Sequence, residues 1–236
     1  MKRLVQIVLL MMLATSLLAM SADAQIPIKF GLKGGINSAT VTGDDAEGYE
    51  SRSGIVGGVF TRLSLGGPIG IQAELLLASK GAKVTFIDEA TSLPVDKTLK
   101  ADYFEVPVLL RYSFKGQGPA GLNLYGGPVF AFGRLSKTEI STLVLGLDVG
   151  GDLDNYNEKS TDLGLALGIG VDLSLARSVV VLEVRYTVGL QDMWEDVVVA
   201  DLPGDLNSLT LYADETTGKA FKMKNSALSF TVGFMF

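Results

Sequence analysis

The strongest constraint on the fold is a strict alternation of side-chain size between residues 162 and 175. Its large members are Leu163, Leu165, Leu167, Ile169, Val171, Leu173 and Leu175, and they alternate with Asp162, Gly164, Ala166, Gly168, Gly170, Asp172 and Ser174. A period of two belongs to a β-strand, which places alternate side chains on opposite faces, whereas a helix repeats every 3.6 residues. The segment therefore predicts a strand with one large apolar face and one small or polar face.

Similar segments recur along the chain and predict further strands. With the first, they cover residues 28–37, 54–64, 71–77, 104–114, 122–135, 162–175, 180–188 and 228–236. The parity of 54–64 is ambiguous, because Gly57 and Gly58 are adjacent. Short connections at 66–68, 115–121 and 176–178 alternate with long polar ones at 38–53, 80–98, 136–161 and 191–224. Short periplasmic turns, long external loops and an even strand number are typical of outer-membrane barrels, so the fold class is predicted as all-β, a transmembrane antiparallel up-and-down β-barrel of about eight strands.

The amino terminus has the features of a secretion signal. Lys2 and Arg3 precede an uncharged run from 4 to 20, and Ser21-Ala22-Asp23-Ala24 fits the small-x-small cleavage pattern. We expect residues 1–24 to be a signal peptide cleaved before Gln25, and residues 25–236 to be the barrel domain. A retained membrane anchor is the alternative, for which the apolar run is short. Export and a barrel together predict the outer membrane of a Gram-negative cell envelope.

The orientation of the two faces separates a membrane barrel from a soluble one. A soluble lipocalin-type barrel places large apolar residues inside, around a ligand, whereas a membrane barrel places them outside. Small residues and long charged ones share the opposite face here, which fits the side-chain-filled interior of an eight-stranded barrel. The predicted interior polar network consists of Lys33, Gln72, Glu74, Glu105, Arg111, Glu183 and Arg185. Its three carboxylates and three cations balance, as buried charges require.

Aromatic residues recur near the predicted strand ends and indicate interfacial girdles. They are Tyr103, Phe104, Tyr112, Phe114, Phe132, Tyr186, Trp194, Phe234 and Phe236. Ordinary aromatic enrichment in strands is the alternative explanation. Phe234 and Phe236 end the chain in phase with an apolar face, and this ending resembles the carboxy-terminal insertion signal of bacterial outer-membrane barrels. The expected partners are therefore outer-membrane lipid and, during insertion, the barrel-assembly machinery.

Five segments, 31–37, 103–112, 125–128, 162–170 and 185–190, together cover nearly the whole mature chain. They resemble the PorT-like outer-membrane barrel family of Bacteroidetes-type bacteria. The stretch Tyr103-Phe104-Glu105-Val106-Pro107 is the most specific of them. The resemblance implies an outer-membrane barrel. One namesake of the family is linked to protein secretion, and most members have no assigned activity.

Two prolines fall inside predicted strands. Pro107 and Pro128 cannot donate to the hydrogen-bond ladder, so each implies a bulge or a missing bond. Two interpretations stay open, an irregularity at a partner or gating surface and a packing feature of the family.

The composition argues against catalysis and nucleic-acid binding. The chain has no Cys and no His, which excludes thiolate sites and the hydrolase mechanisms that need a His base. A net charge of −6 without a basic patch disfavours nucleic acid. Glu74 and Glu105 could act as an acid–base pair, but a structural ion-pair network is the favoured interpretation. The acidic residues between 148 and 158 lack the EF-hand spacing and indicate a solvated loop. We expect no catalytic residues, no cofactor and no metal.

Three functions remain. The preferred one is a non-enzymatic structural or interaction module of the cell envelope, with a secretion-related role as one form of it and an envelope protein as partner. The second is a porin-like pore or a transport barrel for small solutes. The third is a secreted soluble barrel that binds lipid.

Overall fold

The structure is a computed structural model that describes residues 28–87, 93–114, 118–144, 147–154, 159–194 and 222–236. The predicted signal peptide and its cleavage site before Gln25 lie outside these residues. No helix in the described ranges is long and apolar enough to cross a membrane.

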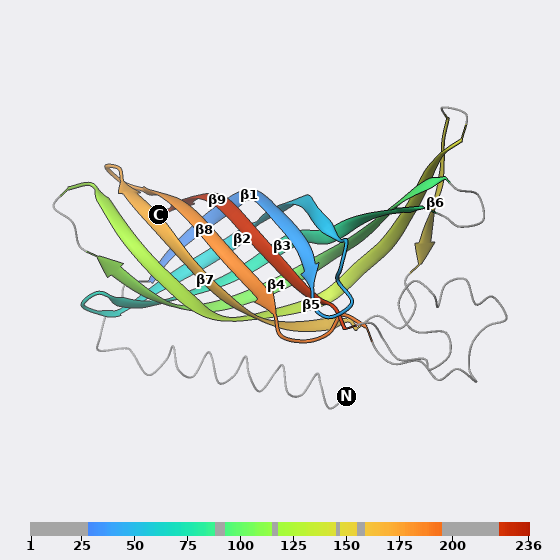
Figure 1. The fold of residues 1–236 in the computed structure, drawn as a ribbon. Coiled ribbons are helices and arrows are strands. Elements are labelled where there is room, and N and C mark those ends of the chain that lie inside the picture. Colours follow the sequence, from blue (N-terminus) through green and yellow to red (C-terminus); the bar gives the residue numbers. More distant parts are fainter. Residues whose placement is uncertain (1–27, 88–92, 115–117, 145–146, 155–158, 195–221) are drawn as a thin grey trace.

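The described residues form nine strands in one sheet. They are β1 (Ile28–Thr42), β2 (Glu50–Gly66), β3 (Ile69–Ile87), β4 (Pro94–Phe114), β5 (Ala120–Val144), β6 (Leu147–Asp154), β7 (Thr161–Ser174), β8 (Val179–Gly189) and β9 (Lys224–Met235). The sheet order is β4-β3-β2-β1-β9-β8-β7-β5-β6, and β4 also pairs with β5, which closes a ring. All pairings are antiparallel, and the ring consists of eight strands, because β6 pairs only with the far end of β5. This confirms the predicted eight-stranded barrel (Figure 1).

The two faces of the ring are sorted as the alternation predicts. Outward side chains such as Ile36, Leu110 and Leu167 are about 60% exposed, whereas their chain neighbours on the inner face are mostly buried. The soluble lipid-binding alternative required the opposite arrangement, so the structure argues against it. On β4, the outward residues from Phe104 to Phe114 form the apolar band, and this length matches the roughly 9–11 residues that a tilted strand needs to cross a bilayer.

Both described chain ends lie at the end of the barrel that carries the short turns. The amide of Phe236 donates to the Phe30 carbonyl at 2.9 Å, so the start of β1 lies beside the end of β9. The β2–β3 turn lies at the same end, and its Gly66 and Gly67 have φ of 103° and 60°, a conformation that favours glycine. Short turns face the periplasm in outer-membrane barrels, so this end is the periplasmic one.

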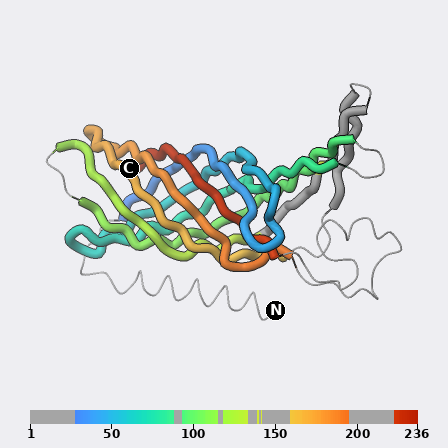
Figure 2. The backbone as a smooth tube through the Cα atoms, viewed as in Figure 1, coloured from blue at the N-terminus to red at the C-terminus, as the bar shows by residue number. Residues whose placement is uncertain are grey.

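At the opposite end, the predicted long loops were wrong over much of their length, because the strands continue through them. β3 and β4 pair as far as Ile87 and Pro94, and β4 and β5 pair as far as Val95 and Thr142. Figure 1 shows β4, β5 and β6 projecting beyond the ring, and in Figure 2 the green part of the trace, in β4, extends in the same direction. We call residues 78–87 of β3, 94–103 of β4 and 133–144 of β5, together with β6, the external extension. They lie beyond the level at which Leu77, Phe104 and Phe132 pair. Polar composition there does not mark loops, because strands outside the membrane need no apolar face.

Each proline removes ladder pairs without a bulge. The β3–β4 register runs from Ala73–Val108 directly to Leu76–Glu105, so pairing is absent where Pro107 would donate. The β4–β5 register likewise skips from Pro107–Val129 to Leu110–Gly126, next to Pro128. The register is the same on both sides of each gap, so the missing-bond alternative is the one observed.

Most of the predicted girdle aromatics face outward, but two do not. Phe104 and Phe132 pair near the external end, and Phe234 and Phe236 lie at the periplasmic end with 57% and 71% exposure. The prediction that Tyr103 and Trp194 belong to a girdle was wrong, because their side chains are only 2% and 1% exposed. Tyr103 has the inward parity of β4, and Trp194 belongs to a cluster at the external mouth. The insertion-signal role of Phe234 and Phe236 stays a prediction.

Candidate functional site in the barrel interior

The structure places the seven residues of the predicted polar network on the inner face of four strands. Lys33 comes from β1, Gln72 and Glu74 from β3, Glu105 and Arg111 from β4, and Glu183 and Arg185 from β8. All except Arg111 are at most 6% exposed, and Arg111 is half-buried. The inward parity of each strand brings these side chains to the barrel axis, although they separate into two groups.

Glu74 is the centre of the larger group. Its carboxylate accepts two hydrogen bonds from Arg185, at 2.8 Å to Oε2 and 2.6 Å to Oε1, and one of 2.7 Å from Lys33 Nζ. Lys33 also donates to Glu183 Oε2 at 2.6 Å, and Gln72 Nε2 donates to Glu74 and Glu183. Charge-assisted, partly bidentate bonds of this kind are strong and fix the side chains in place.

Two residues that the sequence analysis did not assign connect Arg111 to this group. Arg62 of β2 donates from Nε to Gln72 Oε1 at 2.5 Å and forms an ion pair with Glu183 at 3.3 Å. Its Nη1 is 2.9 Å from Asp172 Oδ2 of β7, and Arg111 binds the same carboxylate. Asp172 therefore links two guanidinium groups. Arg62 was missed because the adjacent Gly57 and Gly58 hid the parity of its strand, whereas Asp172 lay on the predicted polar face.

Glu105 belongs to a second group nearer the external end. Its carboxylate is 2.5 Å from Lys80 Nζ, and both side chains are buried. Lys80 was missed because it lies in 80–98, a segment predicted as a loop. Glu74 and Glu105 thus bind different cations, which removes the basis for an acid–base pair.

Aromatic rings fill the space around the charges. The Phe60 ring lies 5.6 Å from Lys33 Nζ and 5.2 Å from Arg62 Cζ, and the Tyr125 ring lies 5.4 Å from Arg185 Cζ. Cation–π contacts at such distances are favourable where water is excluded. The rings and ion pairs together occupy the middle of the lumen.

The connected group carries one net positive charge. Its cations are Lys33, Arg62, Arg111 and Arg185, and its carboxylates are Glu74, Asp172 and Glu183. Each carboxylate is held by at least two cations, so none is available as a metal ligand or a base. No three His, Cys, Asp or Glu side chains gather to hold a metal within the described ranges, and the side chains of the acidic segment 148–158 lie outside them.

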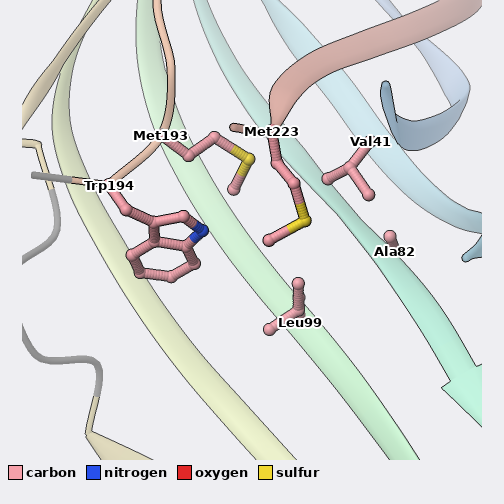
Figure 3. Close-up of a cluster of buried hydrophobic side chains, with 6 residues drawn as sticks. All are labelled: Val41, Ala82, Leu99, Met193, Trp194 and Met223. Atoms are coloured by element: carbon pink, nitrogen blue, oxygen red, sulfur yellow. The ribbon is translucent and has the colours of Figure 1, made fainter. Parts of the chain in front are cut away.

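A hydrophobic cluster lies at the external mouth, and Figure 3 shows its six side chains. It consists of Val41, Ala82, Leu99, Met193, Trp194 and Met223, all at most 4% exposed, with Ala46 and Tyr49 packed against it. The amide of Met193 donates to the Met223 carbonyl at 2.8 Å, so the residues after β8 and before β9 meet across the mouth. Met193, Trp194 and Met223 were predicted from the sequence to lie in an external loop. The apolar side chains of these three residues, within an otherwise acidic segment, could have indicated that they are buried.

Burial shifts two titratable groups of this region, which lies outside the membrane-spanning segments. Burial raises the pKa of the Tyr49 hydroxyl above its usual value. It lowers the pKa of the Lys97 ammonium from 10.5 to about 8, because water solvates the charged form better than the barrel interior does. Lys97 lies two residues before Leu99 on the inner face of β4 and is 5% exposed.

Lys97 is expected to make stability depend on pH. Between about pH 8 and 10.5 the unfolded chain binds more protons at this position than the folded one, so the free energy of unfolding rises with pH there, by at most about 1.4 kcal/mol per unit. Subtracting the unfolding curve of Lys97→Met from that of the native chain isolates this slope. Lys83→Met, at an exposed lysine of the same hairpin, is the control and retains the slope. A native-minus-Lys97→Met difference that is flat between pH 8 and 10.5 would contradict the assignment.

The comparison with known protein families agrees with the observed barrel fold. The family model of the outer membrane protein beta-barrel domain matches residues 21–195. The chain belongs to this family. Members are barrels of the outer membrane, which is therefore the location of the protein. The narrower PorT-like resemblance stays a prediction, and no curated protein matches the chain.

Solved outer-membrane proteins are similar over most of their length. Neisserial surface protein A is 15% identical, with 86% of this chain and 95% of that chain covered and a TM-score of 0.38. Ail, the attachment invasion locus protein of Yersinia pestis, is 14% identical, with 88% and 98% covered and a TM-score of 0.37. OprG from Pseudomonas aeruginosa is 14% identical, with 89% and 95% covered and a TM-score of 0.43.

Proposed function

We propose that this family member is a closed, non-enzymatic outer-membrane barrel that anchors its external extension as a binding surface for another component of the cell envelope. The observation that carries the proposal is the filled lumen. The ion-pair network occupies its middle, and the cluster around Trp194 lies across its external mouth. A barrel filled in this way has a structural role in the membrane, and the parts free to make contacts are outside it.

The space between network and mouth is also occupied. Lys80 lies 5.6 Å from the Tyr103 ring and pairs with Glu105, and Asn225 Nδ2 donates to the Tyr103 hydroxyl at 2.6 Å. The Asn225–Tyr103 bond connects β9 to β4 on the opposite wall, whereas Lys80 and Glu105 come from the neighbouring strands β3 and β4 and occupy the space beside it. This argues against the alternative of a small-solute pore, which needs a continuous aqueous path.

The external extension supplies the binding surface. At the tip of its β3–β4 hairpin, Phe86 and Ile87 are 42% and 70% exposed. They lie far beyond Phe104, where lipid no longer covers the strand. Contiguous exposed apolar surface on the aqueous side commonly marks protein contacts. A secretion-related role, as the PorT-like resemblance implies, is one form that such a contact would take.

Photo-cross-linking in intact cells tests the proposal. A benzoylphenylalanine at Phe86 is expected to give a discrete protein adduct, whereas the same group at Leu110, on the lipid face, gives none. A chain in which 85–96 is replaced by a two-residue turn should still insert and should lose the partner. Absence of an adduct at Phe86, Ile87 and Val95 in correctly inserted protein would contradict the proposal. If cells with the shortened chain no longer released a protein that cells with the native chain secrete, the contact would serve protein secretion.

A further inference from the structure

A polar cavity of 340 Å³ lies inside the barrel at the periplasmic end. Residues of the β2–β3 turn line one side of it, and residues of β1, β2, β3, β4, β7, β8 and β9 line the rest. Its charged lining residues are Lys29, Arg62, Arg111 and Asp172, and three serines, Ser64, Ser113 and Ser174, add hydroxyl groups. A water occupies about 30 Å³ in the liquid, so the cavity has room for a small polar ligand with several waters.

The charges of this cavity do not balance. Asp172 is its single carboxylate, and it is shared between Arg62 at 2.9 Å and Arg111. Lys29 makes no ion pair with a described residue. Arg62 has further partners in Gln72 and Glu183, but Glu183 is itself held by Lys33 and Arg185. Three cations thus face one carboxylate, and the larger network behind them contributes no spare negative charge.

Arg111 has hydrogen-bonding capacity that the protein does not use. Its Nη2 binds Asp172, while its Nε is buried and has no hydrogen-bond partner within the described part of the chain. A buried unpaired donor is unfavourable unless a ligand or water satisfies it. The side chain is 14% exposed, and it lines the cavity.

We propose that this cavity is a binding site for a small oxyanion, a phosphate or carboxylate group that enters from the periplasmic side and is held by Lys29 and Arg111. A guanidinium matches the geometry of both oxyanions, and an ammonium on a flexible stem completes the charge. The low-dielectric barrel wall strengthens the attraction relative to open water. The site does not depend on a partner of the external extension.

Arginine side-chain NMR of the refolded protein in detergent micelles tests the site. Inorganic phosphate and N-acetylglycine are the probes, with sodium chloride at equal ionic strength as the reference, and Arg111→Lys identifies the Arg111 Nε–H signal. We expect a saturable shift of this signal with at least one probe. Phosphate alone would indicate a phosphate ligand, N-acetylglycine alone a carboxylate, and both a general oxyanion site.

Lys29→Met keeps the test independent of the internal ion pairs, because Lys29 takes no part in them. The apparent dissociation constant should rise at least tenfold in Lys29→Met and stay unchanged in Lys83→Met, at an exposed lysine of the opposite end. Shifts no larger than those with chloride, or equal affinity in the native and Lys29→Met proteins, would overturn the proposal.

Discussion

Glu74→Gln is expected to lower the free energy of unfolding by about 3–5 kcal/mol, the usual effect of removing one partner from a buried ion pair. The substitution keeps the shape of the side chain but leaves Lys33 and Arg185 facing a neutral amide. Both cations are at most 6% exposed, so water cannot replace the lost carboxylate. Because Lys33 and Arg185 both donate to the Glu74 carboxylate at 2.6–2.8 Å, the substitution deprives two cations of the same partner.

Denaturant unfolding of the refolded protein in lipid vesicles measures this effect. Trp194 is the single tryptophan of the chain, so its fluorescence reports on the packed mouth. Glu50→Gln, at an exposed carboxylate, is the matched control and should change stability by less than about 0.5 kcal/mol. Adding Lys33→Met to Glu74→Gln should recover part of the loss, because one orphaned charge is removed. Equal stability of Glu74→Gln and Glu50→Gln would show that the network does not hold the barrel together.

Gly35→Ala is expected to cost about 3 kcal/mol, whereas Gly34→Ala at the adjacent position should be neutral or slightly stabilising. A Cβ on Gly35 would lie 1.9 Å from the Phe230 carbonyl oxygen and 2.8 Å from Thr231 Cα, both of them backbone atoms of β9. Backbone in a closed ring cannot move aside without breaking the β1–β9 ladder, so overpacking here lies at the upper end of its usual range. A Cβ on Gly34 meets nothing closer than 3.9 Å, and alanine there restricts the unfolded chain.

The two alanine variants differ in neither composition nor hydropathy, so their comparison isolates the position. Cooperative unfolding in the same vesicles gives both free energies, and the fraction that shows heat-modifiable migration gives folding yield. If the two variants unfolded at the same denaturant concentration, the close approach of β1 and β9 at Gly35 would be contradicted.

The faces of the barrel were predictable from sequence because strand periodicity is a local property. Leu167 and Gly168 could be assigned to opposite faces from their neighbours alone, and the structure places them so. The same reasoning failed where the local pattern lacks a large residue on one face. Adjacent Gly57 and Gly58 left the parity of β2 undetermined, and with it the inward direction of Arg62.

Other features depend on contacts between distant segments, which no local pattern encodes. Lys80 was assigned to a loop because a strand outside the membrane carries polar residues on both faces. Trp194 and Met223 pack together although 28 residues separate them in the chain numbering, of which 195–221 lie outside the described residues. The partners within the polar network were equally undetermined, because parity places a charge inside the barrel without specifying which opposite charge it meets. Asp172 between Arg62 and Arg111 is the clearest case.

Ion conductance in a planar bilayer tests the closed lumen most directly. The refolded protein, with insertion verified by protease protection of the membrane-spanning strands, is expected to give no stepwise currents at moderate voltage. We expect the ion pairs around Glu74 and the cluster around Trp194 to block the path at two separate levels. Stable, uniform current steps from inserted protein would contradict the account, because they would require a continuous aqueous path through both levels.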